Sequence, residues 1–141
     1  MNTRCALSLM FATLFLAGTT SGQEKTVEKV PMRHTSPASG AEMYRSYCAA
    51  CHGPNGKGDG PAASALKTPP ADLTTLAKRH DGTFPKNEVY ETISGQHTVS
   101  AHGSKEMPVW GNLFRSVDPH QGITMMRINN LTDYIASLQQ R

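Results

Sequence analysis

Residues 48–52 of the chain read Cys-Ala-Ala-Cys-His, a spacing that can attach a porphyrin covalently and also supply an iron ligand. Two thiols three positions apart on a helical turn can reach two vinyl groups on one edge of a porphyrin. The imidazole that follows them then faces the iron. The motif therefore predicts one c-type haem, bound through thioether bonds to Cys48 and Cys51, with His52 as the fifth ligand of the iron.

A zinc half-site and a redox dithiol are the two other interpretations of this motif. Zinc in proteins takes about four ligands, and the only further cysteine, Cys5, lies in a segment that we predict is removed. A thioredoxin-like pair would follow a strand of a βαβ unit, but the residues before Cys48 show neither strand-like alternation nor an apolar run. Both interpretations are weaker than haem attachment.

A single histidine leaves the sixth iron position to another side chain. Met107 is followed by proline and lies between two predicted helices, far enough after His52 to reach the opposite face of a porphyrin. A thioether stabilises ferrous iron, and a filled sixth position excludes oxygen and peroxide. Met107 is therefore the predicted sixth ligand, with His97 and His102 as alternatives. Methionines in helical patterns more often pack than ligate, which applies to Met43, Met125 and Met126.

Two further residues are assigned to the cofactor site. His52 should donate its second ring N–H to a carbonyl, which fixes the orientation of the ring, and Pro61 in the glycine-rich loop is the candidate for that carbonyl. Trp110 either packs against the haem edge, with its N–H near a propionate, or fills the core. Lys78 and Arg79 either neutralise propionates or lie in solvent at a helix end.

The elements that position these side chains are predicted to be short helices. Ser39 to Glu42 has the form of a capping box and begins a helix that runs into the haem motif. Other helices are expected over about 73–79 after Asp72, between Pro85 and Gly95, and over about 122–140 with an apolar stripe. Residues 53–61 and 94–106 are expected to be loops. No segment has sustained two-residue alternation, so the predicted class is all-α.

The N-terminal residues have the three-part plan of a secretory signal peptide. Arg4 precedes an apolar stretch over residues 6–17, and small and polar residues follow up to Gly22. A membrane-spanning helix needs about 20 apolar residues, so we expect residues 1–22 to be cleaved rather than to anchor the protein. Residues 23–35 are polar and without period, and are predicted to be a flexible leader to one domain over residues 36–141.

Charge and composition exclude several classes of partner. The 141-residue chain has a formal charge of +3, which falls to +2 when Arg4 is lost with the signal. The basic residues are spread along the chain, so no nucleic acid and no anionic membrane surface is implied. With 38% hydrophobic residues, the porphyrin must supply much of the core, and the chain without haem is expected to be largely unfolded.

From about Gly40 to Leu138 the chain resembles the class I cytochromes c, small bacterial monohaem proteins. The resemblance rests on Gly40-x-x-x-Tyr44 before the motif, on the loop Gly53 to Pro61, on Met107-Pro-Val-Trp110-Gly, and on Leu131-x-x-Tyr134-Ile135. It implies a fold of about four helices around one haem, in which Gly40 lets the first helix cross the last and Tyr44 meets Tyr134. The long polar loop 94–106 and the segment 116–122 depart from the family pattern at the rim of the haem crevice.

The resemblance implies an electron carrier rather than an enzyme. We expect a periplasmic, monomeric cytochrome that shuttles single electrons between respiratory redox partners through small, transient interfaces. Two alternatives remain. One is a haem protein in which a labile Met107 permits peroxidase activity or small-molecule sensing, and the other is a cytochrome subunit of a larger respiratory or dehydrogenase complex.

Overall fold

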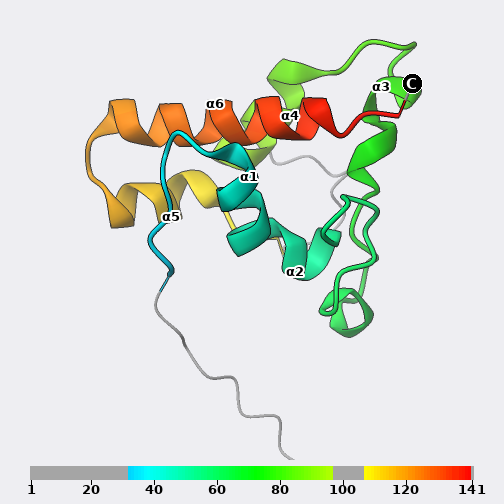
Figure 1. Ribbon diagram of the computed structural model, residues 1–141, viewed down its shortest axis with the longest axis horizontal. Coiled ribbons are helices and arrows are strands. Elements are labelled where there is room, and N and C mark those ends of the chain that lie inside the picture. The colour runs from blue at the N-terminus through cyan, green and yellow to red at the C-terminus, as the bar shows by residue number, and fades with distance from the viewer. Residues whose placement is uncertain (1–31, 97–106, 141) are drawn as a thin grey trace, which may run out of the picture. The chain divides into compact units, whose positions relative to one another are not determined.

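The computed structural model describes residues 32–96 and 107–140, and every regular element in these two ranges is helical. The predicted all-α class is confirmed. The predicted signal peptide and most of the leader lie outside the described residues. The helices, coloured along the chain in Figure 1, are α1 (Gly40–Met43), α2 (Ala49–His52), α3 (Leu76–Arg79), α4 (Lys86–Ser94), α5 (Trp110–Val117) and α6 (Gln121–Ser137). Within the described ranges, no helix is long and apolar enough to span a membrane.

The first helical segment carries the predicted haem motif. The Ser39 side chain accepts a hydrogen bond from the N–H of Glu42 (3.2 Å), as the capping box predicts. The Glu42 carboxylate accepts from the N–H of Ser36 (3.2 Å). A π-helical turn, Tyr44–Cys48, joins α1 directly to α2. One continuous helical segment therefore presents both cysteines and the histidine.

Helix α1 crosses α6 at Gly40. A Cβ on this residue would lie 2.0 Å from the carbonyl oxygen of Asn130 and 2.9 Å from Cβ of Tyr134, so the approach requires glycine. The rings of Tyr44 and Tyr134 meet beside the crossing, with centroids 5.2 Å apart, which confirms the expected contact. Tyr44 is fully buried and donates to the carbonyl of Gly53 (2.8 Å). Burial raises the pKa of Tyr44, so its hydroxyl remains a donor.

The two short helices in the middle of the chain occur where they were predicted. The Asp72 carboxylate accepts from the N–H of Thr74 (2.8 Å) and begins a 3₁₀ turn, Leu73–Thr75, that leads into α3. Pro85 precedes α4, and Gly95 ends it in the left-handed conformation (φ 79°).

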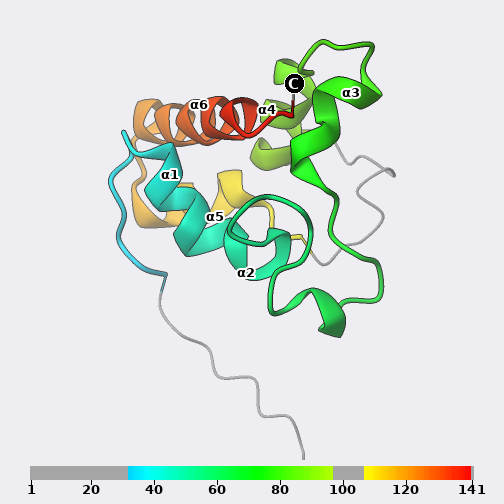
Figure 2. The same cartoon turned by 45° about the vertical axis from the view of Figure 1, so that its right-hand side comes forward.

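The end of α6 is fastened to the segment around α3. The Gln139 side chain accepts from the N–H of Ala77 (2.9 Å) and donates to the carbonyl of Leu73 (2.7 Å). The N–H of Gln140 donates to the carbonyl of Thr74 (2.9 Å). Figure 1 and Figure 2 both show the last turn of α6 beside α3. These hydrogen bonds fix the end of the chain after α6 to the segment 73–77.

Helix α5 was not predicted from the sequence. Gly111 and Asn112 have low helix propensity, and no side chain caps the first turn. Tertiary burial stabilises this helix, because Phe114 is 0% exposed and packs on the other helices. The signal that could have indicated α5 is the helical spacing of Trp110, Leu113, Phe114 and Val117.

The described part of the predicted leader, residues 32–35, packs on the domain. Thr35 is only 8% exposed, and Met32 packs against the core. The Thr35 hydroxyl lies 2.8 Å from that of Tyr47 and accepts from Arg127 of α6 (3.1 Å). The described part of the leader is therefore packed on the domain, because its polar groups find buried partners there.

Candidate functional site

A pocket that is open to solvent is lined by side chains from α2, α3, α4, α5 and α6. Cys48, His52, Met107 and Trp110 lie on its wall, so the structure brings together four of the six predicted site residues. The rest of the wall is mostly apolar and includes Leu73, Leu76, Val89, Ile93 and Ile135.

The two cysteines lie at the end of the first helical segment and form no disulfide bond. Burial, together with a smaller effect of the nearby Cys51, raises the pKa of the Cys48 thiol to about 12. A thiol with so high a pKa is a poor metal ligand and a poor redox nucleophile. Among the described residues, no group of three or more His, Cys, Asp or Glu side chains could hold a metal ion. The high pKa of the Cys48 thiol makes the redox-dithiol interpretation weaker.

The ring of His52 is oriented by a backbone carbonyl. Its Nδ1 lies 3.0 Å from the carbonyl oxygen of Ala71, so the prediction that Pro61 provides this carbonyl is wrong. The residues on either side of Pro61 donate instead to the carbonyls of Cys51 and Ala50 (3.0 and 2.9 Å), which holds the loop against the end of α2. If His52 is the iron ligand, as its place in the motif predicts, an Nδ1 directed at Ala71 would make Nε2 the nitrogen that faces the iron.

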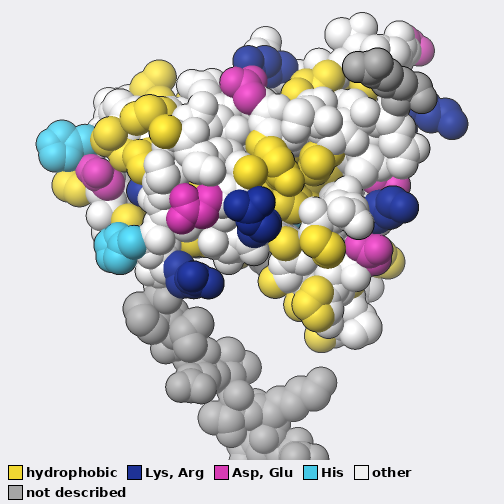
Figure 3. All heavy atoms as spheres, in the orientation of Figure 1, with side chains coloured by type: hydrophobic (Ala, Val, Ile, Leu, Met, Phe, Trp, Pro, Cys, Tyr) yellow, Lys and Arg dark blue, Asp and Glu magenta, His cyan; other side chains and the backbone are white. Residues whose placement is uncertain are grey.

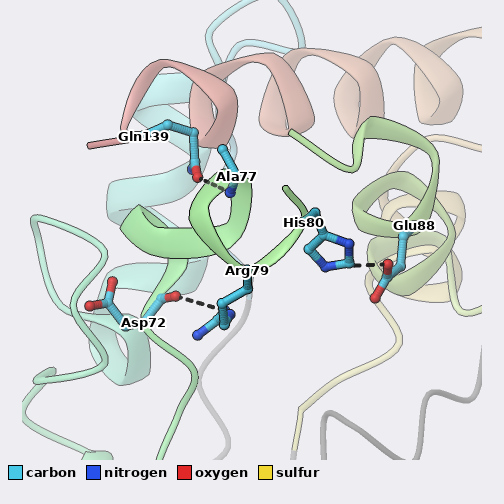
Figure 4. A network of polar contacts seen from close by, with 6 residues as sticks. All are labelled: Asp72, Ala77, Arg79, His80, Glu88 and Gln139. Atoms are coloured by element: carbon cyan, nitrogen blue, oxygen red, sulfur yellow. Dashed lines mark hydrogen bonds and ion pairs between the residues drawn. The ribbon is translucent and has the colours of Figure 1, made fainter. Parts of the chain in front are cut away.

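The segment that carries this carbonyl is itself braced. The Asp72 carboxylate accepts from both the N–H and the hydroxyl of Thr74 (2.8 and 2.7 Å). The guanidinium of Arg79 donates to the carbonyl of Asp72 (3.0 Å), as Figure 4 shows. Arg79 is exposed, and this hydrogen bond supports the chain next to Ala71. Sequence reasoning had no signal for the role of Ala71, because every residue carries a carbonyl.

Trp110 lies on the cavity wall and is also part of an aromatic cluster. Its ring stacks on that of Tyr47 with centroids 5.4 Å apart and an interplanar angle of 29°. Phe114 completes the cluster, at 5.9 Å from Trp110 and 5.7 Å from Tyr47. Both interpretations offered for Trp110, the cofactor wall and core packing, are therefore compatible with its position.

The other candidates for the sixth ligand differ in their surroundings. Met43 is buried in the core, and Met125 and Met126 are exposed on α6. His97 and His102 lie outside the described residues. Of the methionines that the structure describes, Met107 is the one on the cavity wall.

Glu88 of α4 is the acidic residue on the described cavity wall. Its carboxylate lies 3.8 Å from Nε2 of His80, and the two side chains are 43% and 40% exposed. Figure 4 shows the His80 ring directed toward Glu88 from the end of α3. A carboxylate at this position stabilises a more positively charged state of a group bound in the cavity.

A family model described as Cytochrome c matches residues 37–139, which is most of the chain. The chain belongs to the cytochrome c family. Members of this family bind haem c covalently, and Cys48 and Cys51 are the attachment pair of this cytochrome. Its mostly apolar cavity, with a cysteine and a histidine of the motif on its wall, fits that group. The chain gave no match among the curated proteins and none among the solved structures.

Family membership also settles the broad activity. The cytochrome is a haem-based electron-transfer protein with the all-helical fold that the resemblance implied. Haem iron takes up and releases one electron when it is bound in such a site.

Proposed function

We propose that this cytochrome is a periplasmic carrier that moves single electrons between respiratory redox partners. The observation that carries the proposal is that His52 and Met107 line one mostly apolar cavity. In this proposal Met107 provides the sixth ligand. A second protein ligand would leave no open position for a substrate, which favours a carrier over an enzyme.

The side chains around the cavity support fast electron transfer. The Ala71 carbonyl fixes the ring of His52 (3.0 Å), so the ligand needs little rearrangement when the oxidation state changes. The apolar wall, including Leu76 and Ile93, excludes water from the same region. Both features lower the cost of reorganisation that accompanies a change of charge.

The surface suits brief encounters with more than one partner. Figure 3 shows hydrophobic side chains gathered near the middle of one face, with positive and negative side chains scattered among and around them. The formal charge of the whole chain is +3. A surface without one strong field provides little electrostatic attraction, so we expect small, weak interfaces with the electron donor and acceptor.

The experiment is a visible spectrum of the purified, haem-loaded protein in the ferric and ferrous forms, followed by carbon monoxide. We expect a far-red sulfur-to-iron band in the ferric protein and no binding of the gas. Met107→Ala should lose the band and bind carbon monoxide. Met126→Ala, a methionine that is 37% exposed on α6, is the matched control and should behave as the wild type.

Two results would contradict the proposal. A wild-type protein that lacks the band and binds carbon monoxide readily would favour the peroxidase or sensor alternative. Recovery of the protein only within a membrane complex would favour the subunit alternative. The periplasmic location is tested separately, by mass spectrometry of the mature N-terminus and by fractionation of the cells.

A further inference from the structure

Arg127 of α6 is a buried cation. The residue is 5% exposed. Nη1 donates to the hydroxyl of Thr35 (3.1 Å) and contacts the sulfur of Met43 (3.6 Å). The guanidinium carbon lies 5.8 Å from the ring centre of Phe114. These partners are neutral, so they stabilise the guanidinium without cancelling its charge.

No carboxylate pairs with this guanidinium among the residues that the structure describes, and its Nε has no hydrogen-bond partner there. Arginine cannot lose its proton in a protein, so the charge persists at every working pH. The Arg127 charge has an effect on the pKa of Asp118. Hydrogen bonds from the backbone and the side chain of His120 lower the pKa of Asp118, and Arg127 contributes last. Asp118 is therefore engaged mainly by His120 rather than by Arg127.

The buried charge lies within reach of the cofactor cavity. Phe114, over which the guanidinium sits, has its ring centre 5.9 Å from that of Trp110. The two separations place the guanidinium within about 12 Å of the indole on the cavity wall. The intervening material is aromatic side chains rather than water, so ions in the solvent screen this charge little.

We propose that Arg127 raises the reduction potential of the haem through its unpaired, buried positive charge. This inference rests on the proposed function. Ferric haem carries one more positive charge than ferrous haem, so a fixed cation nearby destabilises the ferric form more than the ferrous form. The reduced state is favoured and the potential rises. A unit charge about 12 Å or more from the iron, at an effective dielectric constant of about 20, would alter the equilibrium by up to roughly tenfold.

A purely structural role is the alternative. The same guanidinium holds Thr35 and Met43, so its loss could simply loosen the packing of residues 32–35. A loosened segment would lower the melting temperature and would leave the potential where it was. Potential and stability are therefore measured on the same samples.

The experiment is potentiometry of the haem-loaded protein at two ionic strengths, together with the ferric spectrum and thermal unfolding. Arg127→Met removes the charge and keeps an unbranched apolar side chain. We expect its equilibrium with a reference couple to shift threefold to tenfold toward the ferric form, where tenfold is about 59 mV. Arg127→Lys retains the charge and should stay within about twofold of the wild type.

Two further variants complete the design. Arg115→Met removes an exposed arginine from α5, and its smaller effect should disappear at high ionic strength. Thr35→Asp places a carboxylate at the partner of Nη1 and should lower the potential with Arg127 still present. If Arg127→Met does not fold, Thr35→Asp carries the test.

The outcomes separate the inference from the proposed function. Arg127→Met or Thr35→Asp with an intact sulfur-to-iron band and an unchanged potential would overturn the role of Arg127 alone. An equal loss of potential in Arg127→Lys and Arg127→Met would do the same, because the charge would then not be the cause. Absence of the band and of a reversible one-electron couple in the wild type would instead overturn the proposed function.

Discussion

The carbonyl oxygen of Ala71 lies 3.0 Å from Nδ1 of His52, across 19 positions of sequence. This contact orients the ring of His52 from a segment that lies outside the Cys-x-x-Cys-His motif. Asp72, directly after Ala71, holds that segment through its bonds to Thr74.

Asp72→Ala should lower the free energy of unfolding at pH 7 by about 1 kcal/mol, the usual effect of removing an N-cap. The hydroxyl of Thr74, with smaller effects from its N–H and nearby cations, lowers the pKa of Asp72. The carboxylate therefore stabilises the fold above its unfolded pKa of about 3.9, and the effect is lost as the pH falls through the lower folded value. Denaturant unfolding at several pH values should show that the difference in the free energy of unfolding between the wild type and Asp72→Ala disappears in acid. Asp133→Ala, which removes the exposed ion pair with Lys86, should change stability by less than about 0.5 kcal/mol.

Gly40→Ala should destabilise the cytochrome by roughly 2–4 kcal/mol, because the new Cβ meets the backbone of Asn130 at 2.0 Å and the helices must separate. Gly122→Ala is the matched control on α6, since nothing lies within 4 Å of a Cβ at that position. It should be neutral or stabilising by up to about 1 kcal/mol. Thermal unfolding of the two haem-loaded variants makes the comparison. Equal stabilities would show that the close crossing at Gly40 is absent in solution.

Glu88→Gln should raise the reduction potential. The Glu88 carboxylate lines the cavity, so it favours the more positive ferric form. The side chain is 43% exposed, and solvent screening should keep the change below about 59 mV, which is tenfold in equilibrium. Glu91→Gln removes the same charge from the same helix at a residue off the cavity wall and should shift the potential less. A lower potential in Glu88→Gln would contradict the sign of the effect.

The double variant Cys48→Ala with Cys51→Ala, produced without haem, should be largely unfolded. Leu73, Leu76, Ile93 and Ile135 belong both to the core and to the cavity wall. Without the porphyrin these side chains lose their packing partner, and native stabilities of about 5–15 kcal/mol leave little reserve. Far-ultraviolet circular dichroism and denaturant titration provide the measurement. A cooperative transition with full helical content would show that the protein core suffices.

The features that were predicted correctly are encoded by residues close together in the chain. Cys48, Cys51 and His52 lie within five consecutive residues, so their spacing alone defines the attachment chemistry. The capping residues Ser39 and Asp72 act on N–H groups two or three positions away. Such local signals need no knowledge of the fold. For the same reason α4 ends at Gly95, as the sequence indicated.

The remaining features depend on contacts between distant segments. The carbonyl at His52 belongs to Ala71 rather than Pro61, and no side chain type marks a carbonyl for that use. Helix α5 forms despite Gly111 because Phe114 is buried by other helices. From the sequence, Arg127 is one charged residue in a predicted helix. Its packing against Thr35 and Phe114 makes it a buried cation. The haem-attachment chemistry therefore follows from the sequence alone, because the residues involved are neighbours in the chain. The orientation of the His52 ring and the burial of the Arg127 charge follow from the tertiary structure, because both depend on distances between segments that are far apart in the sequence.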